Sequence, residues 1–164
     1  MIASLPNQGR ADEVLVDCGP GSFTGIRVGL AAARAFGMAW AVPVRGYSSL
    51  SLIAAAGFLA DVKIERLAVA IIGGHGEYFV QLFESQPVRA LSPLASLKPD
   101  AAVMLCGDLP LVGSGASPIR AAGAGGGLLS AEIDARHVTL LPPELVSLPP
   151  SPLYGRAPDA RLPA

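Results

Sequence analysis

The sequence reads Gly19-Pro20-Gly21-Ser22-Phe23-Thr24-Gly25-Ile26-Arg27 directly after a short apolar run, and this stretch decides the fold. The run from Val14 to Val16 predicts a buried strand, and the glycines that follow it predict a tight turn. Ser22 or Thr24 can cap a helix, and no proline interrupts the chain from Thr24 to Trp40. We therefore predict a strand, a glycine-rich turn and a helix in direct succession.

The glycine-rich turn has two interpretations. Free backbone N–H groups at such a turn can hold an anion. However, no Lys-Ser or Lys-Thr pair follows it, and Gly19, Gly21 and Gly25 only come close to the spacing of a dinucleotide-binding loop. Glycines also allow a sharp turn in which a helix packs closely on a strand. We favour close packing and keep a phosphate-binding loop as the alternative.

Small residues recur at every fourth position along the predicted helix. They place a stripe of short side chains on one face, where another helix can approach closely. A glycine inside a helix costs roughly 1 kcal/mol relative to alanine, so close packing must offset that loss. An internal contact and a partner-binding interface explain the stripe equally well, whereas Arg27 and Arg34 argue against a membrane dimer. The stripe consists of Gly25, Gly29, Ala33 and Gly37.

The rest of the chain alternates between strand and helix signals, which indicates an α/β fold. A second helix is predicted from Ser48 or Ser49 to about Phe58, and a turn of Gly73-Gly74-His75-Gly76 predicts a β-hairpin. A glycine- and alanine-rich loop is predicted at 121–127. Extended pieces or strands are predicted at 42–45, 67–72, 77–83, 102–106 and 111–112.

Two lobes are expected, with a boundary near 61–65. The first lobe takes residues 1–60, including the glycine turn and the helix with the small-residue stripe, and the second takes residues 61–164. The C-terminal part is rich in proline and is predicted to lie extended over the surface. Its prolines are Pro142, Pro143, Pro149, Pro150 and Pro152.

Composition narrows the classes of function. Charged residues make up only 15% of the chain and hydrophobic ones 51%, so we expect a partner to cover part of the surface. The net charge is -1 and no long basic run occurs, which disfavours direct nucleic-acid binding. Cys18 and Cys106 are too few for a zinc or disulfide framework. No apolar run spans a bilayer, and a cytoplasmic protein is expected.

Catalytic and metal-binding patterns are scarce. Neither histidine has a neighbouring ligand at metal-binding spacing, and neither candidate serine lies in a G-x-S-x-G elbow. The two aspartates that follow strand-like runs could hold a metal, but solvated turn residues are the favoured interpretation. We therefore predict no catalytic residue and no metal ligand. The residues considered are His75, His137, Ser22, Ser114, Asp17 and Asp108.

Residues 19–30, Gly-Pro-Gly-Ser-Phe-Thr-Gly-Ile-Arg-Val-Gly-Leu, resemble the signature of the TsaB (YeaZ) family. The family motif loop is the stretch from Gly19 to Arg27. The resemblance runs along nearly the entire chain. Further similar stretches are Pro43 with Gly46-Tyr47-Ser48-Ser49-Leu50, Gly76-Glu77, Gly113-Ser114-Gly115-Ala116 and Pro152-Leu153-Tyr154-Gly155-Arg156.

The resemblance implies an actin-like (ASKHA, ribonuclease H-like) fold with two lobes. It also implies a role in forming N6-threonylcarbamoyladenosine next to the anticodon of ANN-decoding tRNAs. The family member is a non-catalytic subunit that pairs with its paralogue TsaD through first-lobe helices, and the ATPase TsaE joins the assembly. The tRNA is then contacted only through the complex. No cofactor is expected in the isolated chain; an adenine nucleotide at the heteromeric contact and a homodimer of the chain alone are alternatives.

The sequence departs from the family pattern in two places. Family chains open with strands that bear an Asp-Thr or Asp-Ser pair, and this chain begins at what resembles the end of the following helix. We therefore expect the first lobe to lack its initial strands, through a misassigned start or a truncation. In addition, Ile72-Gly73-Gly74-His75 stands where the family often has Asp-Ala-Arg-Arg.

Two hypotheses of function follow. The first is a scaffold subunit that binds a TsaD-like paralogue, with the stripe from Gly25 to Gly37 as the helix contact. The second is an enzyme acting alone, either a small actin-like ATPase or a peptidase-like (glycoprotease) protein. The ATPase would use residues 19–25 or 113–115 as phosphate loops. Nucleotide turnover by the isolated chain would favour the second hypothesis.

Overall fold

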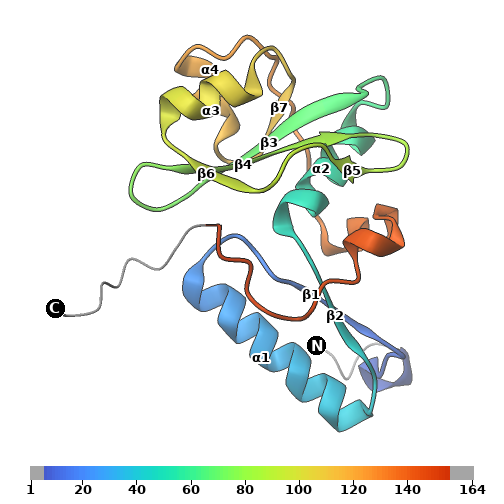
Figure 1. Ribbon diagram of the computed structural model, residues 1–164. Coiled ribbons are helices and arrows are strands. Elements are labelled where there is room, and N and C mark those ends of the chain that lie inside the picture. Colours follow the sequence, from blue (N-terminus) through green and yellow to red (C-terminus); the bar gives the residue numbers. More distant parts are fainter. Residues whose placement is uncertain (1–5, 156–164) are drawn as a thin grey trace, which may run out of the picture. The chain divides into compact units, whose positions relative to one another are not determined.

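The computed structural model describes residues 6–155, which belong to two compact units (Figure 1). The first unit contains the residues up to Ser49 together with Pro143–Leu153. The second contains Leu50–Pro142 and, at the end of the described range, Tyr154 and Gly155. Residues 1–5 and 156–164 lie outside the described range, and with them the expected truncation point and Arg156 of the C-terminal motif.

A strand–helix–strand succession forms the first unit. β1 (Val14–Asp17) and β2 (Val44–Tyr47) make a two-stranded parallel sheet, and α1 (Phe23–Trp40) connects them. Parallel strands need such a crossover, because the chain must return to the starting end of the sheet before the second strand begins. The 3-10 helix η2 (Pro6–Gly9) precedes β1. The small core between helix and sheet consists of Val16, Cys18, Leu30 and Ala33.

The predicted first helix and its cap are confirmed. The Ser22 hydroxyl accepts the Gly25 N–H at 3.3 Å and caps α1. At the other end, Ala41 adopts a left-handed backbone with φ of 55°, and its N–H donates to the carbonyls of Gly37 and Met38. β2 begins two residues later than the predicted extended piece at 42–45.

The proline-rich segment Pro143–Leu153 closes the first unit. After the 3-10 helix η4 (Pro143–Leu145), Leu148 forms an antiparallel bridge with Gly46, with N–O distances of 2.7 and 3.1 Å. The Leu153 N–H donates to the Cys18 carbonyl at 2.8 Å, and Leu153 packs against the core. The assignment of this segment to the second lobe is therefore wrong, because its partners lie in the first unit.

The second unit is organised around β3 (Arg66–Ile72). This strand pairs antiparallel with β4 (Tyr78–Glu84), which confirms the predicted hairpin, and parallel with β7 (Leu111–Val112). The strand order is β5-β4-β3-β7, where β5 is Arg89–Ala90, and β6 (Ala95–Leu97) also pairs with β4. The unit also contains α3 (Pro99–Cys106), α4 (Ala116–Ala121) and the 3-10 helix η3 (Ala135–Leu140).

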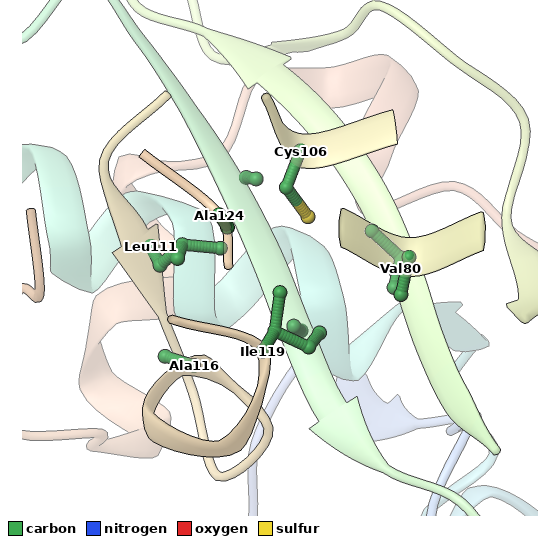
Figure 2. Packing of buried hydrophobic residues seen from close by; sticks show 9 residues of the cluster. Val80, Cys106, Leu111, Ala116, Ile119 and Ala124 are labelled. Carbon is green, nitrogen blue, oxygen red and sulfur yellow. The ribbon is translucent and has the colours of Figure 1, made fainter. Parts of the chain in front are cut away.

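β3 is buried on both faces. Leu67 and Val69 enter a core with α2 (Ser49–Ala60), whereas Ala68 and Ala70 enter a core with α3 and α4. A strand covered on both faces has apolar residues at consecutive positions, which explains the uninterrupted apolar run. Figure 2 shows the second of these cores, in which Cys106 and Ile119 approach the sheet from the two helices.

The predicted strand at 102–106 is wrong, because these residues form the end of α3. A short apolar run fits a buried strand and a buried helix turn equally well. Within α3 only Ala102 and Cys106 are buried, four residues apart, as expected for one face of a helix. Pro99 occupies the first turn, where its missing N–H costs no hydrogen bond.

The predicted lobe boundary after residue 60 is also wrong. Leu50, Ile53 and Phe58 of α2 pack with Phe83 of β4, so the helix belongs to the second unit from Leu50 onward. The predicted loop at 121–127 is irregular from residue 122, directly after α4. Among the helices within residues 6–155, none is long and apolar enough to cross a bilayer.

Replacing Gly46 with valine should destabilise the first unit, because a side chain there would collide with the Cys18 thiol and the Pro149 carbonyl. Overpacking of this kind costs about 1–3 kcal/mol. Trp40, the single tryptophan, ends α1, so its fluorescence in a denaturant titration reports on this unit. Gly127→Val, placed in open space in the second unit, is the matched control. Equal stability of the two variants would contradict the packing.

Candidate functional site

The Asp17 carboxylate organises the turn between β1 and α1. It accepts the Gly19 N–H at 2.7 Å and the Ser49 hydroxyl at 2.7 and 2.8 Å. The Ser49 N–H donates to the Gly19 carbonyl at 2.9 Å. The prediction that Asp17 is a solvated turn residue is therefore wrong. Sequence reasoning missed the pair, because Asp17 and Ser49 are 32 positions apart and follow two different strands.

Close packing explains the glycine turn. Gly19 has a φ of +94°, which favours glycine, and a Cβ there would lie 2.5 Å from the Ile26 Cδ1 atom. The N–H groups of Gly19 and Gly25 are already bonded to oxygens of Asp17 and Ser22. These two N–H groups are thus not free to bind a phosphate. The Asp17 carboxylate, which holds one of them, would also repel the phosphate charge.

The second glycine turn, at 113–115, is also explained by packing. The Gly115 N–H donates to the Ala70 carbonyl at 2.9 Å, and a Cβ on Gly113 would collide with the same carbonyl. The Ser114 hydroxyl accepts the Ile72 N–H at 3.0 Å. These groups fasten the turn to β3, so the geometry does not favour the phosphate-loop alternative here.

The two thiols are buried, and burial keeps them in the protonated, unreactive form. Cys18 lies against the Pro149 carbonyl at 3.6 Å, and burial, with a smaller contribution from the Asp17 charge, raises the pKa of its thiol. Burial raises the pKa of Cys106 to about 11. The pKa of Tyr47 is also raised, first by burial and then by the charges of Asp17 and Cys18.

The histidines and the second aspartate have local roles. His137 Nδ1 accepts the Asp134 N–H at 3.4 Å in a capping box, so it is not a purely solvated side chain. The backbone carbonyl of His75 accepts a hydrogen bond from the Lys98 ammonium group at 3.1 Å. Asp108 is exposed, as predicted. In the part of the chain that the structure describes, no three potential metal ligands cluster together.

The predicted small-residue stripe winds around α1 rather than forming one face. Ala33 and Gly37 are buried, and a Cβ on Gly37 would collide with Val44 of β2. Gly25 and Gly29 are exposed, and a Cβ on Gly29 would meet nothing within 4 Å. The structure thus divides the predicted partner site into an internal half and an outer half. The internal contact is with a strand, not with another helix.

The outward side of α1 carries a different row, four apolar residues preceded by a threonine, which we call the α1 seam. Its members are spaced by four, three, four and three residues, the spacing of a helix–helix seam. Val28 is 62% exposed and Met38 86% exposed, and α1 contains no acidic residue. The sequence carried this signal, but it could be recognised only once the sheet-facing side was known. The α1 seam consists of Thr24, Val28, Ala31, Ala35 and Met38, all exposed.

Comparison with known proteins gives the family. Residues 7–91, more than half of the 164-residue chain, match the family model described as TsaD, tRNA N6-adenosine threonylcarbamoyltransferase. The chain belongs to the TsaD family. The match includes the glycine turn, α1 and the hairpin. Together with the fold, it supports the predicted TsaB-like assignment.

Two solved structures share the fold. YeaZ from Pseudomonas aeruginosa superimposes with a TM-score of 0.72 and 24% identity, covering 88% of this chain and 73% of that one. A second structure, described as an uncharacterized protein with similarity to the peptidase YeaZ from Pseudomonas aeruginosa, has a TM-score of 0.68 and 21% identity, covering 79% and 64%. The predicted α/β, actin-like fold class is confirmed.

Curated relatives match over a shorter stretch. The uncharacterized protein ML0378 of Mycobacterium leprae is 57% identical over 42 residues, which are 26% of this chain and 12% of that protein. The uncharacterized protein Rv3421c of Mycobacterium tuberculosis is 55% identical over 42 residues, 26% of this chain and 20% of that protein. The match therefore spans a fifth or less of the length of these relatives.

Alanine at Gly29 and at Gly37 should have opposite effects on stability. Gly29→Ala should raise the free energy of unfolding by about 0.5–1 kcal/mol, because alanine favours a helix and the site is open. Gly37→Ala should lower it by about 1–3 kcal/mol, because Val44 must move. Denaturant titration followed by Trp40 fluorescence compares the two. A stabilising Gly37→Ala would contradict the packing of α1 on β2.

The two cysteine thiols should not react with a thiol reagent in the native protein. Because the pKa of Cys106 is raised to about 11, its thiolate fraction at pH 8 is on the order of 10⁻³, and Cys18 shifts in the same direction. Ellman's reagent should label neither cysteine at pH 8 within minutes, and both in about 6 M guanidinium, which lies above the midpoint of about 5 M that only hyperstable domains exceed. Rapid native labelling of Cys18 would show that the segment at Pro149 opens readily.

Proposed function

We propose that this chain is a non-catalytic partner subunit of the complex that forms N6-threonylcarbamoyladenosine beside the anticodon of tRNA. In this role it binds a TsaD-like paralogue and supports that protein's transferase activity. A TsaE-like ATPase joins the assembly, and tRNA is contacted through the complex in the cytoplasm. The single observation that carries the proposal is the α1 seam, an exposed apolar row on the helix that follows the family motif loop.

The chemistry of the α1 seam suits a helical partner. Ala31 and Ala35 are short, so a second helix can approach closely, and Val28 and Met38 supply larger apolar surfaces on either side. Burying each of these larger side chains contributes about 1.5–3 kcal/mol. Gly29 lies about 140° around the helix from the centre of the seam, and a Cβ there would meet nothing within 4 Å.

Family membership directs the choice of partner. The matching model describes a threonylcarbamoyltransferase, and the fold is that of YeaZ. In a two-fold interface the same surface of two identical subunits meets, and two different proteins of one fold can pair in the same way through equivalent helices. A TsaD-like protein from the same organism is therefore the partner to test. The chain itself is proposed to hold no cofactor, and nucleotide turnover by the isolated chain would speak against this assignment.

Introducing a charge into the α1 seam should abolish partner binding. Ala35→Glu should weaken association with the TsaD-like protein at least about 100-fold, because burying an unpaired carboxylate is costly. The measurements are co-purification and threonylcarbamoyladenosine formation on tRNA by the reconstituted proteins. Gly29→Leu tests the outer half of the predicted small-residue stripe instead, and it should block binding by steric overlap, with the chain still folded, only if that part of α1 also meets the partner.

Ala101→Glu is the matched control, because Ala101 is an exposed alanine on α3 in the second unit. It should bind and support modification like the unaltered chain. If Ala35→Glu is folded and binds as well as Ala101→Glu, the α1 seam is not the partner surface; if Gly29→Leu binds as well as Ala101→Glu, the outer half of the small-residue stripe is not part of it. If the unaltered chain neither binds the TsaD-like protein nor supports modification, the scaffold proposal itself is wrong.

A further inference from the structure

Gly19 is held at both of its backbone polar groups. Its N–H is bonded to Asp17 and its carbonyl to the Ser49 N–H, while the Ser49 hydroxyl bonds both oxygens of the Asp17 carboxylate. The three residues form a closed ring of hydrogen bonds at the end of β1. Such a ring leaves Gly19 little freedom, because a shift of the glycine would break bonds on two sides.

The first turn of α1 depends on where Gly19 lies. Pro20 and Gly21 are the only residues between Gly19 and the helix cap Ser22. In addition, Ile26 packs so closely against Gly19 that a Cβ would be 2.5 Å from its Cδ1 atom. The ring therefore determines how the start of α1 lies on β1. Thr24 and Val28, the first two members of the α1 seam, are carried on these turns.

We infer that Asp17 is a positioning residue for partner binding, with the Ser49 hydroxyl as its counterpart, and this inference rests on the proposed function of the α1 seam. Neither side chain touches the partner. The ring holds the first turn of the helix in the orientation that a partner helix meets, so less ordering is needed on association. Loss of the ring lowers affinity even when the chain remains folded.

Removal of the Ser49 hydroxyl tests this role. Ser49→Ala should weaken binding to the TsaD-like protein by about 10-fold, the lower end expected when a hydrogen bond to a charged group is lost. Ser49→Thr keeps a hydroxyl and should restore affinity to within about 3-fold of the unaltered chain, well below that tenfold loss. Calorimetric titration gives the affinities, and thermal unfolding is recorded for every variant. Binding by Ser49→Ala equal to that of the unaltered chain would overturn the inference.

The second unit offers a control of the same chemistry. The Ser96 hydroxyl donates to the Glu77 carboxylate at 2.7 Å, the length of the Ser49 bond. Ser96→Ala should lower stability to a similar extent without changing affinity. Equal losses of affinity in Ser96→Ala and Ser49→Ala would show a general effect of destabilisation and overturn the positioning role.

Asp17→Asn provides a second route to the same answer. Combined with Ser49→Ala, it should weaken binding no more than the stronger single variant, because both changes break one ring. Fully additive losses would contradict a shared ring. Failure of the unaltered chain to bind would instead overturn the proposed function, so the two failures are distinguishable.

Discussion

The first unit depends on the meeting of three chain segments at Gly46. Its sheet has two parallel strands, and a sheet of this size is not stable by itself. α1 covers one face, and the segment at Leu148 and Pro149 adds an antiparallel bridge on the free side of β2. Only a residue without a side chain lets that segment and the Cys18 thiol approach β2 together. The proline-rich C-terminal part is thus a structural member of a unit formed mainly by the first residues of the chain.

The sheet of the second unit is stabilised in a different way. β3 pairs with strands on both sides and is covered on both faces, so its alternate residues contribute to two separate cores. Local sequence suffices to build the hairpin, whereas β7 and the turn after it must be brought in from farther along the chain. Gly113 and Gly115 permit this by lying directly against the carbonyl of Ala70. The glycine turns of both units therefore serve close packing of backbone on backbone or side chain.

Sequence reasoning succeeded where a signal is local. The helix cap at Ser22, the strand before it and the hairpin around 73–76 each depend on neighbouring residues, and all three are confirmed. It failed where the deciding partner is distant. The ring between Asp17 and Ser49 and the bridge between Gly46 and Leu148 join residues that no local pattern relates. The run at 102–106 failed for another reason, because a single helical turn and a short strand bury the same residue types.

The predicted small-residue stripe shows why only part of the candidate site could be predicted from the sequence. Positions four apart advance by about 40° around a helix with 3.6 residues per turn, so four such positions drift from one side to another. Gly37 and Ala33 end against the sheet, and Gly29 and Gly25 end at the surface. A row that alternates steps of four and three drifts far less, and the α1 seam has this spacing. One helix thus combines an inner side that fits the sheet and an outer apolar side whose orientation depends on the turn before it. Gly19 of the family motif loop sets that orientation through its hydrogen bonds with Asp17 and Ser49 and its close contact with Ile26. This links the fold of the first unit to the surface proposed for binding.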